Sequence, residues 1–169
     1  MDNFTIRRAD SLDVKRIAEL RLLSQKHFEK SNPSIWRITE EGKKLLKQKV
    51  ENDMANCNVQ ILLAEADGEI IGYAQGEVTC RNDYAPRTVG QISLVFVLKH
   101  FRRKGVGTRL MEELCKFFNA NKAEYLTVRY IIGNKEAGEF WRKLGFESII
   151  TTSTTCLNEL NLKLKVITS

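Results

Sequence analysis

The chain has 169 residues and a formal net charge of +6, from 27 lysines and arginines against 21 aspartates and glutamates. Hydrophobic residues make up 43% and charged residues 28%, which is ordinary globular usage and argues against a disordered chain. At roughly 150 residues per domain, the length predicts a single domain over residues 1–169. Only two histidines are present, which disfavours a histidine-rich metal site, and no metal is expected. The positive charge predicts an anionic partner: a nucleic acid, a membrane surface or a phosphorylated ligand.

The sequence indicates a cytoplasmic protein. No apolar run follows the basic residues near the N-terminus, as it would in a signal peptide. No stretch approaches the roughly 18 apolar residues that span a membrane, so no membrane partner is expected. The cysteines are far apart and form no CxxC pair, which disfavours zinc and predicts reduced thiols. They are Cys57, Cys80, Cys115 and Cys156.

The first third of the chain predicts a short strand, a helix, a loop and a second helix. The strand alternates apolar and polar residues, and the first helix carries apolar residues at helical spacing. The loop has an Asn-Pro-Ser break, and the second helix is lysine-rich on its outer face. These elements are a strand over 4–8, a helix capped by Asp10 or Ser11, a loop over 27–39 and a helix over about 40–54.

The middle of the chain predicts three strands. Asp67-Gly68 lies between two apolar runs, residues 61–65 and 70–78, and this is a strong hairpin signal. Residues 90–98 form the next strand, which is almost wholly apolar in its second half. That composition predicts a central strand buried on both faces.

The remaining elements predict the fold class. A basic loop and an amphipathic helix separate the strand over 90–98 from a short strand over 125–130, which implies a parallel βαβ crossover. Asn134 caps a further helix, and Gly145 ends it. Two last strands are expected over 148–155 and 157–166. We predict an α/β fold (α+β mixed) with a central mixed, mostly antiparallel β-sheet, a parallel βαβ crossover and helices on both faces.

The sharpest local feature is the basic glycine loop Arg102-Arg103-Lys104-Gly105-Val106-Gly107-Thr108. It precedes a helix, whose first amides have no internal partner and lie at the positive end of the helix dipole. Glycines also let a backbone approach a phosphate closely. The loop therefore predicts a site for a pyrophosphate or a similar anion, the alternative being a solvated helix entry. It is neither a P-loop nor a dinucleotide fingerprint, because no Gly-Lys-Ser/Thr follows and only two glycines are present.

Two motifs resemble the GCN5-related N-acetyltransferase superfamily. The strand Gln91–Val97, followed by Arg102-x-x-Gly105-x-Gly107, is similar to the acetyl-CoA motif of that family. The run Asn134-x-x-Ala137-x-x-Phe140-Trp141-x-x-Leu144-Gly145-Phe146 is similar to its next block. The resemblance covers nearly the whole chain and implies the acyl-CoA N-acyltransferase fold. It also implies acetyl-CoA as co-substrate and direct transfer of the acetyl group to a primary amine of a small molecule or peptide.

The resemblance further implies which residues bind the cofactor. Amides of the loop over 102–108 would hold the coenzyme A pyrophosphate, in agreement with the helix-terminus argument. Main-chain groups of Val95, Phe96 and Val97 would pair with the pantetheine arm, as a peptide adds to an open sheet edge. Asn134 would contact the cofactor, and its other role is a plain N-cap. Arg142 or Lys143 either touches the adenosine phosphates or belongs to a solvated helix face.

The sequence departs from the family at both usual acid–base positions. Many members have a glutamate base where Gln91 stands and a tyrosine acid where Trp141 stands. A glutamine accepts no proton at neutral pH. We take Glu77 and Tyr130 as substitute catalytic residues. The alternative for Glu77 is a solvated residue at a strand end, and the alternative for Tyr130 is a half-buried aromatic side chain. Tyr73 or Tyr84 is an alternative acid–base residue. Otherwise a water chain carries the proton to another group, the substrate amine has a low pKa, or coenzyme A leaves as a thiolate without a proton donor.

The acceptor site is expected near the first helices and the hairpin loops. Trp36 and Tyr84 are the candidate substrate-binding residues, although Trp36 alternatively plugs the core. No dense acidic patch favours a polycationic acceptor. The strand over 157–166 is expected to be an exposed edge, which predicts a homodimer.

Two other function classes compete with the enzyme. One is a non-catalytic or weakly catalytic acyl-CoA-binding or sensor module, which the missing glutamate and tyrosine favour. The other is nucleic-acid binding, which calls for a basic stripe interleaved with exposed aromatics. The charges cluster instead at the glycine loop and on the helix face of Lys43, Lys44 and Lys47. We therefore expect a phosphorylated cofactor and no nucleic acid.

Overall fold

The computed structural model describes residues 3–167. The chain divides into two compact units, and the boundary in the sequence falls between Ile131 and Ile132. The first unit contains β1 (Thr5–Arg8), η1 (Ser11–Asp13), α1 (Val14–Ser31), α2 (Pro33–Trp36), α3 (Glu40–Lys44), α4 (Leu46–Ala55), β2 (Val59–Ala66), β3 (Glu69–Cys80), β4 (Thr88–Val97), η2 (Lys99–Phe101), α5 (Val106–Ala120) and β5 (Tyr125–Val128). The second unit contains α6 (Lys135–Lys143) and α7 (Leu157–Ile167).

The first unit is built on a five-stranded sheet in the order β1-β2-β3-β4-β5. The first three pairings are antiparallel, and β4 pairs with β5 in parallel. The helix α5 makes the crossover between these last two strands, as the motif order predicts. Asp67 and Gly68 have positive φ of 49° and 77°, the conformation that a tight hairpin turn requires. The predicted mixed sheet and its hairpin are confirmed.

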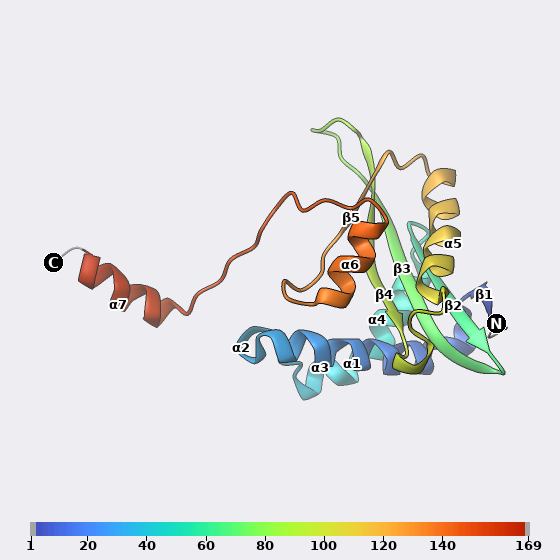
Figure 1. Ribbon diagram of the computed structural model, residues 1–169, viewed down its shortest axis with the longest axis horizontal. Coiled ribbons are helices and arrows are strands. Elements are labelled where there is room, and N and C mark those ends of the chain that lie inside the picture. The colour runs from blue at the N-terminus through green and yellow to red at the C-terminus, as the bar shows by residue number, and fades with distance from the viewer. Residues whose placement is uncertain (1–2, 168–169) are drawn as a thin grey trace. The chain divides into compact units, whose positions relative to one another are not determined.

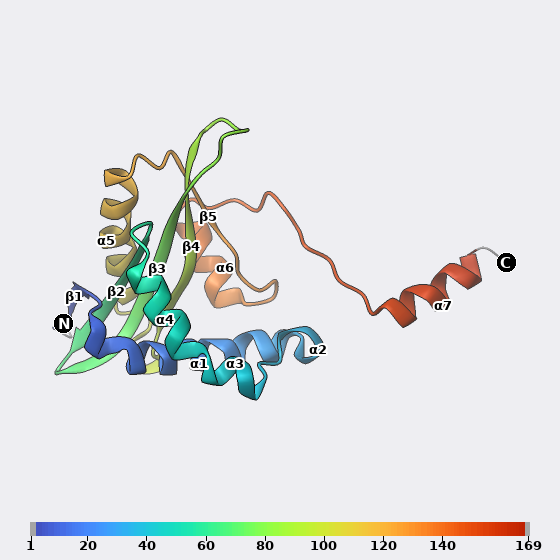
Figure 2. The ribbon, with the colours of Figure 1, turned by 180° about the vertical axis from the view of Figure 1, so that it is seen from behind.

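Helices cover both faces of this sheet, as the sequence predicts (Figures 1 and 2). One face is packed against α5: a Cβ on Gly76 would lie 2.5 Å from the Phe118 ring, and one on Gly90 would lie 2.6 Å from it. Glycine is therefore required at both strand positions for α5 to approach this closely. The other face packs against α1 and α4 through a buried apolar cluster that includes Ile17, Leu20, Val50, Ile61, Leu63 and Tyr73.

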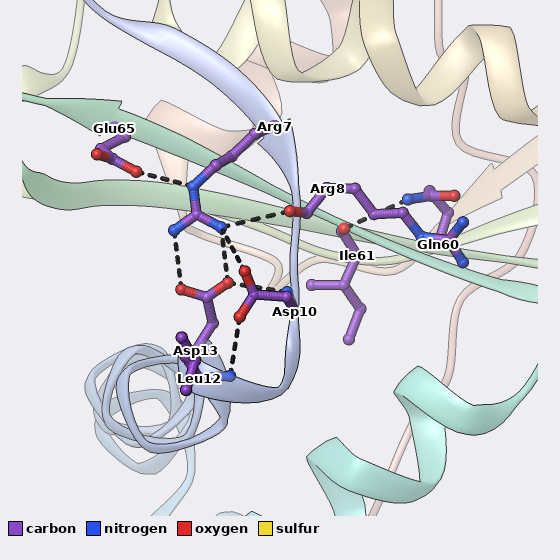
Figure 3. Close-up of polar contacts among 8 residues, drawn as sticks. All are labelled: Arg7, Arg8, Asp10, Leu12, Asp13, Gln60, Ile61 and Glu65. Carbon is purple, nitrogen blue, oxygen red and sulfur yellow. Dashed lines mark hydrogen bonds and ion pairs between the residues drawn. The ribbon is translucent and has the colours of Figure 1, made fainter.

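An ion-pair network ties the first strand to the start of α1 (Figure 3). The Arg7 guanidinium donates to both carboxylate oxygens of Asp13, at 2.7 and 2.9 Å, and to Glu65 on β2 at 2.8 Å. Asp13 also accepts the Asp10 amide, while Asp10 caps η1, so the predicted capping acid is confirmed. The hydrogen bonds from Arg7 lower the pKa of Asp13, although burial of the carboxyl group opposes the shift.

The predicted loop over 27–39 is wrong in part. Helix α1 continues to Ser31, because this segment contains neither proline nor glycine. The chain leaves the helix at Asn32, which is extended and precedes a proline. Asn32 then caps the short α2, whose first residue is Pro33, a favoured helix start. The helix expected over 40–54 is interrupted at Leu45, which separates α3 from α4.

The two C-terminal strands expected over 148–155 and 157–166 are not found. Residues 147–156 have no regular secondary structure, and Leu157–Ile167 forms α7. Apolar alternation gives a strand only beside a partner strand, and no described strand pairs with this segment. Its leucines, lysines and glutamate are good helix formers, so local propensity decides. The strand on which the homodimer prediction depended is therefore a helix.

Candidate active site

The site is centred on β4, whose two halves are paired differently. Residues 89–92 pair with β3 on one side and with β5 on the other. The pairing with β5 ends at Ile92. At this point the register with β3 also shifts, because Gly76 pairs with Ile92 while Gln75 pairs with Leu94. Ser93 is thus an extra residue on β4, a β-bulge that redirects the strand at the end of its parallel pairing.

Beyond the bulge, one edge of β4 lies outside the β5 ladder. The Leu98 amide donates to the Ile71 carbonyl of β3 at 2.8 Å. Hydrogen-bonded and non-hydrogen-bonded pairs alternate along an antiparallel ladder, so the main-chain groups of Val95 and Val97 point away from β3. The expectation that β4 is buried on both faces is wrong here: Leu94 to Val97 are only partly buried, because β5 covers no more than the first half of the strand.

The basic glycine loop runs from the end of β4 into α5. Gly105 is the N-cap residue and has φ +83°, a left-handed conformation that glycine adopts without strain. The helix has no side-chain cap. Its first intrahelical bond joins the Arg109 amide to the Gly105 carbonyl, so the amides of Val106, Gly107 and Thr108 precede the hydrogen-bonded turns.

The basic side chains of the loop lie close to the open half of β4. Arg102 Nε donates to the Val97 carbonyl at 2.9 Å, and its guanidinium lies 5.9 Å from the centre of the Phe96 ring. Arg103 and Lys104 are exposed, and the Lys104 ammonium lies 5.5 Å from the centre of the Phe101 ring. Arg102 therefore adjoins the strand edge, and two further cations of the same loop precede the helix N-terminus. This arrangement fits a ligand that has a diphosphate at one end and an extended amide-bearing arm at the other.

The register between β3 and β4 also fixes the position of Glu77. Glu77 on β3 is the direct partner of Gln91 on β4, and Gln91 is the partner of Thr127 on β5. Side chains alternate along a strand, so Glu77 shares a face with Gln75, which bonds to residues of α1 and α4. Glu77 is partly buried, whereas Gln91 is exposed. The carboxylate therefore stands one strand away from the position at which the resembled family often has its glutamate.

The other predicted catalytic and substrate-binding residues lie outside the strand pairings that surround Glu77. Tyr130 follows the end of β5 and is 37% exposed. Tyr84 lies in the loop between β3 and β4, with the Arg81 guanidinium 5.3 Å from its ring centre. Trp36 is about half exposed and packs edge-on against Phe28. No strand pairing brings any of these three aromatic residues next to Glu77 among the residues described.

Asn134 belongs to the second unit. Its side-chain oxygen accepts the Ala137 amide at 3.1 Å, so the predicted N-cap of α6 is confirmed. Gly145 ends that helix with φ +86°, also as predicted. Trp141 packs against both Phe140 and Phe146, with ring centres 4.9 and 5.2 Å apart. A contact between Asn134 and a cofactor stays a prediction.

Sequence reasoning missed a polar cluster beneath α1 and α4. Arg21 donates to Asp53 and to Gln75, and Gln75 donates to Asp53. These residues come from three elements that are distant in the sequence, so no spacing rule connects them. The one available signal was a glutamine inside the apolar run over 70–78, since a buried polar side chain needs a partner.

Three further features concern the described residues. Within residues 3–167, no group of three or more His, Cys, Asp or Glu side chains could hold a metal ion. In the same range no helix is long and apolar enough to cross a membrane. All four cysteines are free thiols.

Comparisons with known proteins define the class. A family model described as an acetyltransferase (GNAT) domain matches residues 57–148. YhfO of Bacillus subtilis, described as an uncharacterized N-acetyltransferase, is 30% identical over 113 residues, which cover 67% of this chain and 72% of YhfO. An N-alpha-acetyltransferase of Sulfurisphaera tokodaii is 32% identical, with 52% of this chain and 56% of that protein covered. The chain belongs to the GNAT acetyltransferase family and is an acyltransferase.

Solved structures show the same fold. A mutant of the BH1408 protein from Bacillus halodurans matches with a TM-score of 0.81 at 19% identity, covering 90% of this chain and 99% of that one. The aminoglycoside N-acetyltransferase AAC(6')-Iy, in a complex with CoA, matches with a TM-score of 0.68 at 19% identity, covering 91% and 96%. The predicted fold class is confirmed.

Proposed function

We propose that the protein uses acetyl-CoA to acetylate a primary amine of a small molecule or a peptide. The observation that carries this proposal is the open half of β4 beside the N-terminus of α5. A strand edge with main-chain groups pointing outward, next to unbonded helix amides and three cations, matches the two chemical parts of coenzyme A. The related acetyltransferases support acetyl as the group transferred.

In this proposal the cofactor is held mainly by main-chain groups. Val95 and Val97 would pair with the pantetheine arm, while the main chain of Phe96 bonds to β3, and the amides over 105–108 would bind the pyrophosphate. Arg102, Arg103 and Lys104 would add positive charge, and Asn134 would make a further contact. Bound acetyl-CoA supplies an activated thioester. Main-chain N–H groups at the bulge would stabilise the negative charge that develops on the thioester oxygen.

Transfer needs a neutral amine. The amine nitrogen attacks the thioester carbon, a C–N bond forms, the C–S bond breaks, and coenzyme A departs. An alkylamine is mostly protonated at neutral pH, its pKa being about 10 as for lysine. We assign removal of the amine proton to the Glu77 carboxylate, because Glu77 pairs directly with Gln91 across the strands. Tyr130 is the proposed donor to the departing sulfur.

The acceptor would lie near the α1–α2 turn and the loop between β3 and β4. Trp36 in α2 and Tyr84 in the loop between β3 and β4 are the proposed contacts, because each is an exposed aromatic side chain. One related protein is an N-alpha-acetyltransferase, and one structural neighbour binds a bisubstrate analogue made from CoA and acetylneamine. Both a peptide amine and a small-molecule amine are therefore included. We also propose a cytoplasmic location; the homodimer stays a prediction.

The test is thiol release from acetyl-CoA in the presence of a panel of amines. The panel contains polyamines, aminoglycosides, amino acids and short peptides with free N-termini. Turnover on at least one amine, with an acetylated product seen by mass spectrometry, is expected. Tight binding of coenzyme A with no turnover on any amine would instead indicate a binding or sensor module. Gln91 and Trp141, in the usual acid–base positions, are the observation that favours this second candidate.

A further inference from the structure

The cluster of Arg21, Asp53 and Gln75 joins three elements at one point. Arg21 Nη2 on α1 lies 2.7 Å from Asp53 Oδ2 on α4 and also donates to Gln75 Oε1 on β3. Gln75 Nε2 donates to Asp53 Oδ2 at 3.2 Å, which closes the ring of contacts. The Arg21 side chain is only 14% exposed, and Gln75 is buried. The three side chains therefore hold one another in a fixed arrangement.

This cluster lies at the bulge. Gln75 is the last β3 residue in register with the open half of β4, because the shift falls between Gln75 and Gly76. Its partner across the strands is Leu94, the residue that follows the bulged Ser93. Counting from the hydrogen-bonded pair of Leu98 and Ile71, the pair of Leu94 and Gln75 is also hydrogen-bonded. Whatever fixes Gln75 therefore fixes the first ladder position after the bulge.

Stability alone does not account for a charged cluster here. The Arg21 side chain is 14% exposed and that of Asp53 34%, so the pair loses part of its hydration, and well-packed apolar residues of similar size often stabilise a fold as well or better. The neighbouring Ile61 and Leu63 form an apolar cluster with the Tyr73 ring, so apolar packing is available at this depth. The buried Tyr73 hydroxyl lies on the Arg21 side of this cluster. A directional network differs from apolar packing because it fixes one arrangement of the strand among several that pack equally well.

We propose that Arg21 is a positioning residue for acetyl transfer. Together with Asp53 it holds the Gln75 side chain, and through the ladder it fixes the β4 main chain just beyond Ser93. These are the main-chain groups that would meet the thioester in the proposed function, so the catalytic part of the inference rests on that function. We assign Arg21 no contact with the substrate, because its side chain is only 14% exposed and its Nη2 bonds to Asp53 and Gln75.

The first test needs no substrate. Amide hydrogen exchange, followed by NMR on the full chain, is compared between the native protein and Arg21→Met. We expect the Leu94 and Phe96 amides to exchange at least tenfold faster in the variant, while Leu63 and Glu65, the β2 partners of Arg7 and Thr5, stay within twofold. Unchanged exchange at Leu94, or equal acceleration on β2, contradicts the inference. Gln75→Met keeps the pair of Arg21 and Asp53 and is expected to give the same local effect.

The matched control is Arg16→Met on the same helix. Arg16 bonds to Glu19, Glu69 and the Ile70 carbonyl, away from the bulge. This variant loses an arginine and its ion pairs just as Arg21→Met does. The Leu94 and Phe96 amides are expected to exchange at the native rate. Acceleration at Leu94 in Arg16→Met would show that loss of any α1 ion pair loosens β4, and would overturn the specific role of Arg21.

The second test reads catalysis. With an amine that the native protein acetylates, Arg21→Met is expected to lower kcat tenfold or more, with KM for acetyl-CoA within threefold. Arg21→Lys should recover part of the loss, and Arg16→Met should match the native kcat. A kcat within threefold of native in Arg21→Met contradicts positioning. If the native protein acetylates no amine, the proposed function fails, while the exchange at Leu94 still decides the inference.

Discussion

The two halves of β4 share one strand but have different neighbours. The first half is paired on both edges and lies under α5, where Gly90 leaves room for Leu126 and Phe118. The second half pairs with β3 alone, and its outward main-chain groups face the basic glycine loop. A single bulged residue, Ser93, separates the two environments.

This difference explains how one apolar strand serves two purposes. Backbone amides and carbonyls form obligatory hydrogen bonds, and in the first half the two neighbouring strands accept and donate them. In the second half the outward groups lie beyond the β5 ladder; the Val97 carbonyl accepts from Arg102, and the outward groups of Val95 can meet an extended ligand. The apolar side chains of residues 94–98 then fit the proposed function, in which a ligand covers part of this segment, and packing against the buried apolar cluster covers the rest. We therefore expect substitutions that crowd the first half, as at Gly90, to change stability, and substitutions along the open edge of the second half to change coenzyme A binding.

The largest effect on kcat is expected from substitution of Glu77, the cross-strand partner of Gln91. Glu77→Gln should lower kcat by roughly 100-fold or more, because it removes the proposed proton acceptor. Glu69→Gln, at the far end of the same strand, is the matched control and should keep the native kcat. Because Glu77 and Gln91 are direct partners, the exchange Glu77→Gln with Gln91→Glu should restore part of the activity. A kcat for Glu77→Gln within threefold of native would exclude Glu77 as the base.

In the paired half of β4, a single methyl group should be costly. Gly90→Ala places a Cβ 2.5 Å from Leu126 and 2.6 Å from Phe118. Overpacking of this kind costs about 1–3 kcal/mol of unfolding free energy, to be measured by urea denaturation. Ser93 is exposed, so Ser93→Ala should change the unfolding free energy by less than about 0.5 kcal/mol. Equal losses in the two variants would remove the contrast between the halves.

The smallest effect is expected far from β4. Asp13→Asn breaks the ion pairs with Arg7 and should cost about 1 kcal/mol, since Arg7 is partly exposed. The pKa of Asp13 is lowered in the folded state, so this stabilisation is complete above the unfolded pKa of about 3.9. It is lost as the pH falls through the lower folded value.

Urea denaturation should therefore show the native protein and Asp13→Asn converging below about pH 3.9. Coenzyme A binding, which we propose occurs at the open half of β4, should be the same for both. A stability difference that persists unchanged at the lowest pH, or one that appears only there, would contradict the sign of the linkage.

Features that depend on neighbouring residues could be predicted from the sequence. The hairpin at Asp67-Gly68, the cap at Asn134 and the helix end at Gly145 follow from local backbone preferences. The glycine loop is also local, so its position before a helix could be predicted as well. The segment over 157–166 could not, because its alternation predicts a strand only where another strand lies beside it.

The parts of the site that depend on pairing were beyond sequence reasoning. The bulge at Ser93 arises from the register of β3 against β4, which no residue type signals. The partnership of Glu77 with Gln91 follows from the same register. The contact between Arg21 and Asp53 joins residues 32 positions apart, on two different helices.

The most direct test is an NMR titration of the protein with coenzyme A, following backbone amide shifts. The account predicts large shifts for Val95, Val97 and the amides over 105–108, with β1 and β2 unaffected. Gly107→Val should remain folded by circular dichroism and lose these shifts, because its side chain blocks the phosphate site. Shifts that avoid the open half of β4 and the start of α5, or native binding by folded Gly107→Val, would contradict the account.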